Sequence, residues 1–495
     1  MFRLGFDNDK YLKMQSEHIK ERINEFGGKL YLEFGGKLFD DYHASRVLPG
    51  FKPDSKIKML LQLKDQAEIV IAINAADIEK NKIRGDLGIT YDLDVLRLID
   101  AFTDFGLYVG SVVLTRFENQ KAAVEFQTRL ENLGIKVYRH YPIEGYPSNI
   151  PFIVSDEGYG KNDYIETQRS LVVITAPGPG SGKMATALSQ LYHENKRGVK
   201  AGYAKFETFP IWNIPLKHPV NLAYEAATAD LNDVNMIDPF HLEAYGETTV
   251  NYNRDVEIFP VLNAMFEKIY GSSPYKSPTD MGVNMAGNCI FDDEAVRLAA
   301  KQEIIRRYYA ALCSLLEGNL QAGEEAHKIE MLMQQAGISV EDRAVVELAL
   351  KKEEETGAPA AAIELPDGTL LSGKTSNLLG AASAMLLNAL KYLANISDDI
   401  LLISPVVIEP IQDLKVNHLR NKNPLLHTDE VLIALSICAA TNPTVELALS
   451  QLQKLRGSEV HSSVVLSEVD LHTFKCLGMN VTCEPKHENN RLFHK

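Results

Sequence analysis

Short apolar segments rich in β-branched residues alternate with amphipathic segments in the first part of the chain. The β-type segments lie at residues 30–34, 68–74, 107–115, 134–140, 171–175 and 200–207. Between them, segments such as 92–105 and 119–133 repeat apolar residues every three or four positions, as a helix does when it covers one face of a sheet. The alternation predicts an α/β fold with an open, mostly parallel sheet that is Rossmann-like or P-loop-like.

The pattern changes twice after this part of the chain. The period is helical from residue 292 to residue 355, which predicts a helical insert. A Pro-Asp-Gly turn between two apolar runs then predicts a hairpin in AAIELPDGTLL, followed by a helix, a strand at 399–408, a second helix and a terminal strand pair. We therefore predict a multidomain chain: an α/β domain with a glycine-rich phosphate-type loop at 1–290, a helical domain at 291–356 and a smaller α/β sandwich domain at 357–495.

Length and charge narrow the classes of function. A chain of 495 residues suits roughly three domains at about 150 residues each. The 51 basic and 66 acidic residues give a formal net charge of −15, whose average field repels nucleic acid and anionic membranes. The five cysteines are scattered without disulfide or zinc spacing, and neither a signal peptide nor a long apolar run occurs. We expect a cytoplasmic protein that binds neither nucleic acid nor a membrane.

Two glycine-rich sequences compete as phosphate loops. The formal Walker A string GTLLSGKT spans residues 368–375, but its first glycine belongs to the predicted hairpin turn and its leucines read as strand. The sequence GPGSGK at 178–183 departs from the string, because Pro177 replaces the first glycine and Met184 replaces the Ser/Thr that binds magnesium. It nevertheless lies between a β-branched run and a helix, where helix N–H groups and the positive dipole end favour an anion.

The loop at 178–183 is therefore the predicted phosphate site. Its members are Gly178, Gly180, Ser181, Gly182 and Lys183. Glycines allow close backbone approach, the serine adds a hydroxyl and the lysine supplies a positive charge. The alternative is a tight strand-to-helix turn that needs glycine only for its backbone.

A third glycine loop belongs to the tandem repeat EFGGKL, whose second copy follows the predicted strand at 30–34. Ligands of open α/β sheets gather beyond the carboxyl ends of the strands. Gly35, Gly36 and Lys37 are therefore expected to extend the phosphate site, with His43 and Arg46 as catalytic candidates. A glycine turn with surface charges is the alternative.

The segment SPYKSPTDMGVNMAGNCIFDDE is the best candidate for a catalytic loop. It is non-periodic, punctuated by glycines and rich in reactive groups, of which Asp280 and Asn284 are the catalytic candidates. A linker in which Asn and Asp cap helices is the alternative. Neither a Gly-x-Ser-x-Gly elbow nor a His-Glu-x-x-His motif nor a kinase signature occurs in the chain.

Three segments together carry a resemblance: EFGGKLFDDYHASRVLPGF, ITAPGPGSGKMATALSQLYHE and SPTDMGVNMAGNCIFDD. Over its whole length the chain resembles a family of uncharacterised bacterial proteins of about this size, described as a domain of unknown function. Some relatives carry an ATP-dependent peptidase label, although this chain has no protease motif. The resemblance implies a cytoplasmic bacterial protein with an α/β, helical and α/β arrangement.

These observations favour an enzyme that acts on a nucleotide or another phosphorylated small molecule by phosphoryl transfer or hydrolysis. Lys183 and the loop amides would hold the phosphate, Lys37 and Arg46 would neutralise charge, and Asp280 would act as base or metal ligand. ATP or another nucleotide with Mg²⁺ is the candidate cofactor, and the metal ligands stay undetermined. The alternative is a non-catalytic, nucleotide-responsive binding or scaffold protein whose helical insert forms a homo-oligomer.

Overall fold

A computed structural model describes residues 3–35, 38–39, 41–85 and 87–488 of the chain. These residues form two compact units. The larger unit comprises Gly5–Tyr224 and Asp233–Val296, and the smaller unit comprises Glu225–Asn232, the chain from Arg297 onward and the residues before Gly5. The division into three domains at residues 290 and 356 stays a prediction.

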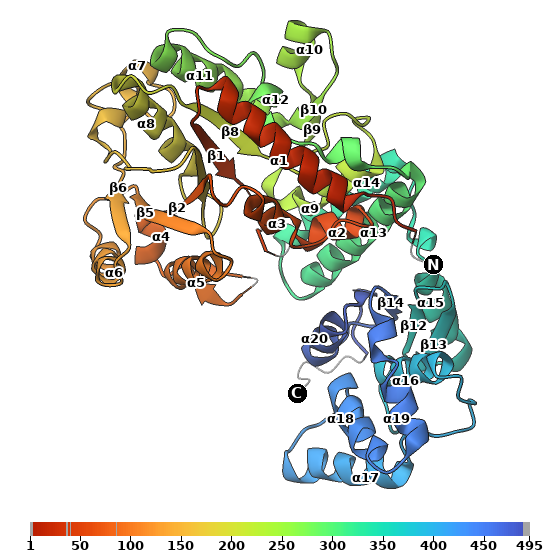
Figure 1. Cartoon of the computed structure of the whole chain (residues 1–495). Coiled ribbons are helices and arrows are strands. Elements are labelled where there is room, and N and C mark those ends of the chain that lie inside the picture. Colours follow the sequence, from red (N-terminus) through yellow and green to blue (C-terminus); the bar gives the residue numbers. More distant parts are fainter. Residues whose placement is uncertain (1–2, 36–37, 40, 86, 489–495) are drawn as a thin grey trace. The chain divides into compact units, whose positions relative to one another are not determined.

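A seven-stranded sheet in the described chain forms the centre of the larger unit, and every strand pair in it is parallel. Figure 1 labels β1, β2, β5, β6 and β8 of this sheet among the surrounding helices. In spatial order the strands are β11 (Gly282–Val283), β8 (Gly202–Phe206), β1 (Leu30–Phe34), β7 (Leu171–Thr175), β2 (Ala67–Asn74), β5 (Tyr108–Thr115) and β6 (Lys136–Arg139). The predicted fold class is therefore confirmed. The predicted strands at 30–34 and 171–175 have the observed bounds, and β11 is an additional edge strand.

Helices cover both faces of this sheet. On one face, α8 (Lys183–Lys196) packs against α11 (Asn253–Tyr270), and both contribute to a core that includes Tyr31 of β1. Leu30 and Leu32 alternate with Tyr31 and are also fully buried, so the opposite face of β1 is covered as well. There α1 (Asn8–Glu25) packs against α3 (Ser55–Leu61) and contacts β8 and β11.

Other elements complete the larger unit. Its remaining helices are α2 (Tyr42–Val47), α4 (Ala75–Glu79), α5 (Tyr91–Asp104), α6 (Lys121–Asn132), α7 (Ile150–Ile153), α10 (Pro239–Tyr245) and α12 (Pro278–Met281), and α9 (Pro219–Ala227) reaches the boundary between the units. Two short ribbons pair β3 (Ile83–Arg84) with β4 (Ile89–Thr90) and β9 (Asn235–Ile237) with β10 (Val250–Tyr252).

The strand order creates a topological switch point between β1 and β7. The connection that leaves β1 leads to β2, whereas the connection that leaves its neighbour β7 leads in the opposite direction to β8. Adjacent strands whose connections diverge leave a crevice at their carboxyl ends, where open α/β sheets bind ligands. The glycine loop at 178–183, which follows β7, begins at this crevice.

The smaller unit contains a four-stranded sheet in the order β13 (Leu370–Lys374), β12 (Ala360–Glu364), β14 (Glu459–Ser462) and β15 (Asn480–Cys483). Its helices are α13 (Asp293–Leu316), whose first residues up to Val296 are assigned to the larger unit, α14 (Gln321–Ala336), α15 (Ala344–Thr356), α16 (Ala381–Leu393), α17 (Pro405–Asp413), α18 (Thr428–Ala439), α19 (Pro443–Leu449) and α20 (Glu468–Cys476). The predicted strand at 399–408 is wrong, because Pro405 begins α17, and proline suits the first helical turn, where its missing N–H costs nothing. No helix of the described chain is both long and apolar enough to cross a membrane.

Candidate functional site

The glycine loop, residues 178–183, connects the buried strand β7 to α8 at the switch point. Gly178 lies against Tyr91: a Cβ atom at this position would be 2.2 Å from the phenol oxygen. Gly180 and Gly182 have φ angles of +76° and +87°, which side chains other than glycine rarely adopt. Three glycines are therefore needed for the backbone path itself, and this need alone does not imply a ligand.

Hydrogen bonds hold the carbonyl groups of the glycine loop. The Ser181 hydroxyl donates to the carbonyl oxygen of Gly178 at 2.9 Å, and the Thr115 hydroxyl donates to the carbonyl oxygen of Ser181 at 2.8 Å. Ser181 is fully buried and Thr115 nearly so. The predicted phosphate ligand Ser181 thus closes the loop with its hydroxyl, while Thr115 of β5 fixes the loop to the sheet.

The amide groups of the same segment are free. Among the described residues, the amides of Gly178, Gly180, Gly182, Lys183 and Met184 donate no hydrogen bond. The first N–H groups of a helix have no intrahelical acceptor and carry the positive end of its dipole. Lys183 is the first residue of α8, so the free amides and one ammonium group occur together at the switch point.

The ammonium group of Lys183 faces a carboxylate from the neighbouring strand. Its Nζ atom is 4.0 Å from Oε1 of Glu33, and both side chains are largely buried, with 15% and 12% of their surface exposed. A separation of 4.0 Å is an ion pair but exceeds a direct hydrogen bond. The other carboxylate oxygen of Glu33 accepts a hydrogen bond of 2.8 Å from the Tyr203 hydroxyl.

Glu33 belongs to a larger group that we call the carboxyl-edge cluster: Glu33, Lys183, Lys205, Glu207 and Asp255. Lys205 of β8 lies opposite Glu33 in the parallel register, and its ammonium group contacts Asp255 and, at 2.9 Å, Glu207. Burial disfavours the charged form of Lys205, but Asp255, Glu207 and Glu33 outweigh burial and raise its pKa above the usual value. Lys205 therefore stays protonated.

The three carboxylates of the carboxyl-edge cluster outnumber its two ammonium groups. Burial and the negative charge of Asp255 raise the pKa of Glu207 to about 7, although Lys205 opposes this shift. Burial and the charge of Glu33 likewise raise the pKa of Tyr203 well above its usual value. Close to neutral pH, Glu207 can therefore gain or lose a proton within the carboxyl-edge cluster.

The second predicted glycine loop is described only in part. Gly35 follows β1 at the carboxyl edge of the sheet, and a Cβ atom there would meet no atom within 4 Å. Gly36 and Lys37 lie outside the described residues. His43 of α2 packs edge-on against Phe209, which follows β8, with ring centroids 5.3 Å apart. Arg46 lies in the last turn of the same helix.

The two candidates from the segment around β11 lie apart from the glycine loop. Asp280 precedes β11, three strands away from β7, and its carbonyl oxygen accepts a hydrogen bond from Arg22 near the end of α1. Its carboxylate accepts hydrogen bonds from the Lys276 amide at 2.8 Å and the Tyr245 hydroxyl at 3.0 Å. Asp280 is therefore separated by the width of three strands from the strand that leads to Lys183.

Asn284 follows β11 and does lie at the carboxyl edge. Its side-chain amide donates to the carbonyl oxygens of Thr208 and Pro210, at 3.3 and 2.9 Å. Its side-chain oxygen accepts a hydrogen bond from the Ala286 amide. Asn284 is buried, and these bonds fix the backbone that follows β8, next to Glu207.

Ser277, His241 and Asp280 lie close together without forming a catalytic relay. Nδ1 of His241 is 2.9 Å from the Ser277 hydroxyl and 3.7 Å from Oδ1 of Asp280. In a serine hydrolase the two ring nitrogens divide these partners, one facing the serine and the other the aspartate. Here one nitrogen faces both, and the buried serine caps α12 by accepting the amide of Asp280. This arrangement gives no support to a peptidase.

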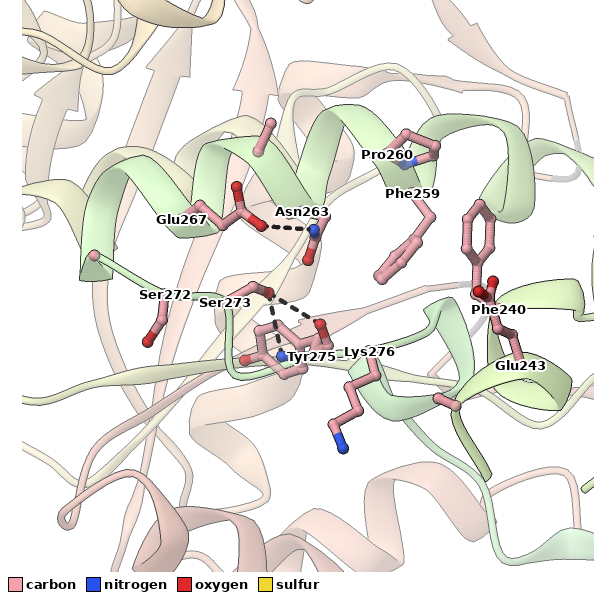
Figure 2. A pocket seen from close by; sticks show the side chains of 13 residues that line it. Phe240, Glu243, Phe259, Pro260, Asn263, Glu267, Ser272, Ser273, Tyr275 and Lys276 are labelled. Atoms are coloured by element: carbon pink, nitrogen blue, oxygen red, sulfur yellow. Dashed lines mark hydrogen bonds between the residues drawn. The ribbon is translucent and has the colours of Figure 1, made fainter. Parts of the chain in front are cut away.

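A pocket of about 890 Å³ lies beside Asp280, between α10, α11 and the loop at 271–276. Figure 2 shows Phe240 and Phe259 together on one side and Lys276 on the opposite side. Asn263 and Glu267 are joined by a hydrogen bond of 3.1 Å along α11. None of the predicted phosphate-binding residues lines this pocket, so the pocket and the glycine loop are separate features.

The Walker-type string at 368–375 lies in a hairpin. Gly373 of β13 pairs with Ala361 of β12, and the Gly368 amide donates to the carbonyl oxygen of Leu365 at 2.8 Å within the turn. The Thr375 amide donates to the carbonyl oxygen of Pro359. These amides are used by the hairpin, as the sequence context predicts.

Metal ligation has little support in the described residues. They contain no group of three or more His, Cys, Asp or Glu side chains placed to hold a metal ion. Met184 also takes the position at which a P-loop supplies a hydroxyl to magnesium. A metal at this loop would therefore need ligands from the bound molecule itself.

Sequence reasoning missed most of the carboxyl-edge cluster. Glu33, Lys205 and Glu207 lie within or directly after apolar strands, in LYLEF and GYAKFE. Charged residues two positions apart at the end of such a strand point to the same face, and this signal could have identified Lys205 with Glu207. The pairing of these residues with Glu33 depends on strand order, which the sequence does not show.

Comparison with known proteins identifies the family. The model described as "Domain of unknown function DUF1846, N-terminal" matches residues 4–337, and "Domain of unknown function DUF1846, C-terminal" matches residues 341–493. The chain is 60% identical over 493 residues to a UPF0371 protein of Corynebacterium diphtheriae, which covers 99% of both chains. It is 58% identical over 495 residues to a UPF0371 protein of Streptococcus uberis, which covers 100% of both. The chain therefore belongs to the DUF1846 family, and the predicted resemblance is confirmed.

Proposed function

We propose that this member of the DUF1846 family binds a phosphorylated small molecule, with a nucleotide as first candidate, at the glycine loop. The free amides of the loop and of the first turn of α8, next to the ammonium group of Lys183, carry the proposal. Backbone N–H groups that converge on one point at a helix start are the usual means of holding a phosphate. The position at the switch point between β1 and β7 adds independent support.

Catalysis is the second part of the proposal. The carboxyl-edge cluster reaches the glycine loop through Glu33 and Lys183, so a carboxylate for proton transfer and an ammonium group for charge neutralisation are available next to the proposed phosphate site. Phosphoryl transfer or hydrolysis fits this set of groups. Arg46 would contribute from α2, and Lys37 remains a candidate from the sequence alone.

One observation favours a non-catalytic alternative. Met184 removes the hydroxyl that holds magnesium in P-loop enzymes, so the loop can bind phosphate without magnesium-assisted chemistry. In this alternative the protein responds to a nucleotide by binding it and acts as a scaffold. Recovery of intact nucleotide after long incubation with metals would favour this alternative.

A thermal-shift screen of the full-length protein tests the proposed binding. The panel contains ATP, GTP, glucose 6-phosphate and inorganic phosphate, each with and without Mg²⁺. A ligand at about 100 times its Kd stabilises the protein by about 2.7 kcal/mol, which gives a clear rise in Tm. Lys183→Ala should lose this rise, whereas Lys121→Ala should keep it, because Lys121 is an exposed lysine of α6. If no phosphorylated compound raises the Tm of the wild type more than that of Lys183→Ala, the proposal fails.

A further inference from the structure

Glu33 lies next to the glycine loop, on the strand that neighbours β7. β1 is the neighbour of β7 in the sheet, and Glu33 is opposite Ile174 in the parallel register, near the carboxyl end of both strands. The side chain of Glu33 reaches the ammonium group of Lys183, the first residue after the loop glycines. Asp280, the carboxylate that the sequence indicates as base, precedes edge strand β11, three strands away from β7, and its carbonyl oxygen accepts a hydrogen bond from Arg22.

The distance between the Glu33 carboxylate and the Lys183 ammonium group allows one oxygen atom to form a hydrogen bond with both. Oε1 of Glu33 and Nζ of Lys183 are 4.0 Å apart. For an oxygen about 2.8 Å from each, the angle between the directions to Oε1 and Nζ would be about 90°. Such an oxygen would accept a hydrogen bond from the ammonium group and donate one to the carboxylate. A hydroxyl group or a water molecule can do both, whereas a deprotonated phosphate oxygen cannot donate.

A hydrogen bond from Tyr203 fixes the orientation of the Glu33 carboxylate. Oε2 of Glu33 accepts the hydrogen bond of 2.8 Å from Tyr203, whose side chain is buried, and this leaves Oε1 to face Lys183. Lys205 lies opposite Glu33 on β8 and is engaged by Asp255 and Glu207. Lys205 therefore adds positive charge near Glu33 without replacing Lys183 as its partner.

We infer that Glu33 is the catalytic base of the reaction at the glycine loop, and that the reaction is hydrolysis of a phosphate ester or anhydride. The inference rests on the proposed function. Glu33 takes a proton from the water held between it and Lys183, and the water oxygen forms a bond to phosphorus. The bond from phosphorus to the leaving oxygen breaks, the electron pair stays on that oxygen, and solvent supplies its proton. Glu33 then returns its proton to solvent.

The test separates binding from turnover in the full-length protein. Phosphate release from ATP, GTP and p-nitrophenyl phosphate, with Mg²⁺ present, is measured for the wild type and Glu33→Gln, and binding of the same compounds is measured by calorimetry. Glu33→Gln should lower kcat by roughly 10²–10⁴-fold, the usual contribution of a general base. Its binding should be equal or tighter, because a negative charge beside the loop is removed. Glu118→Gln removes an exposed carboxylate that follows β5 at the same sheet edge and should match the wild type.

Two further variants keep the inference testable if Glu33→Gln does not fold. Glu33→Asp retains the carboxylate and should keep partial turnover. Tyr203→Phe removes the hydroxyl that orients Glu33 and should lower kcat with little change in KM, as expected of a positioning residue.

The outcomes separate the inference from the proposed function. Wild-type turnover in Glu33→Gln, or binding by the wild type without phosphate release from any probe, overturns the inference and leaves the proposed binding intact. Absence of binding by the wild type, with Lys183→Ala indistinguishable from it, overturns both.

Discussion

The chain contains two similar sequences of glycine and lysine, at residues 178–183 and 368–375, that belong to different kinds of secondary structure. The string at 368–375 satisfies the Walker A pattern, but it forms the turn and second strand of a hairpin in the smaller unit. The glycine loop at 178–183 breaks the pattern at Pro177 and Met184, yet it joins a buried parallel strand to a helix of 14 residues in the larger unit.

The difference lies in what the backbone amides do. In the hairpin, the amides of Gly368 and Thr375 already donate to carbonyl oxygens, and Gly373 is present because α16 packs directly on it. In the glycine loop, the carbonyl groups of Gly178 and Ser181 accept hydrogen bonds from Ser181 and Thr115, and the amides are free. A phosphate-binding loop is defined by free N–H groups, so the setting of a glycine sequence is more informative than its match to a pattern.

The largest predicted effect concerns the glycines themselves. A Cβ atom at Gly373 would lie 2.2 Å from the backbone nitrogen of Met385, whereas a Cβ atom at Gly180 would meet nothing within 4 Å. Gly373→Ala should therefore destabilise the protein by about 3 kcal/mol through overpacking. Gly180→Ala should cost about 1 kcal/mol, because only its positive φ is unfavourable. Chemical denaturation of both variants measures the difference, and equal costs would contradict the assigned roles.

The second comparison concerns the effects of Lys183 and Lys374 on ligand binding. Lys183→Ala should weaken the binding of a phosphorylated ligand about 10- to 100-fold, because a charge-assisted hydrogen bond contributes about 1.5–3 kcal/mol. Lys374→Ala should leave binding unchanged, since Lys374 is an exposed residue of the hairpin. Calorimetric titration of both variants with the ligand found by screening measures the ratio. A larger loss in Lys374→Ala would reverse the assignment of the phosphate site.

The carboxyl-edge cluster, which Lys183 links to the glycine loop, gives a pH-dependent prediction. The pKa of Glu207 is raised from 4.5 to about 7 in the folded protein, so the folded state binds more protons than the unfolded state between these values. The contribution of Glu207 to stability is complete below about pH 4.5 and is lost as pH rises through about 7. Between about pH 5 and 8 the loss should amount to about 2 kcal/mol.

Glu207→Gln removes this titration. Denaturation curves at the two pH values should show a smaller loss of stability on raising the pH for Glu207→Gln than for the wild type. Identical pH dependence in both proteins would show that Glu207 does not titrate in this range.

The smallest predicted effect concerns the anchor of the glycine loop. Thr115→Val removes the hydrogen bond of 2.8 Å to the carbonyl oxygen of Ser181 while it keeps the shape of the side chain. The variant should lose about 1 kcal/mol of stability and bind phosphate more weakly. Thr369→Val, in the hairpin turn, is the matched control and should leave phosphate binding unchanged. Unchanged stability and binding in Thr115→Val would mean that the sheet does not fix the loop.

Much of the fold follows from local patterns. The strands at 30–34 and 171–175 have their predicted bounds, because β-branched runs between polar turns leave little choice of structure. The secondary structure of residues 399–408 was predicted wrongly, because a short apolar run suits a strand and a buried helix equally. Only Pro405 indicates that a helix begins there. The two-residue strand β11 has no periodic signal at all.

The site was less accessible to sequence reasoning than the fold. The loop with Lys183 carries a local signature, whereas Glu33 becomes its partner only because β7 inserts between β1 and β2. The position of Asp280 depends in the same way on the parallel pairing of β11 with β8. The order of the strands in the sheet decides both the pairing of Glu33 with Lys183 and the position of Asp280. Residue type and spacing do not encode this strand order.

Hydrogen–deuterium exchange with and without a saturating phosphorylated ligand tests the central claim most directly, because it reports on the amide groups themselves. The account predicts slower exchange of the amides at residues 178–185 when ligand is bound, and no change at residues 368–375. Protection that appears at residues 368–375 and not at residues 178–185 would contradict it.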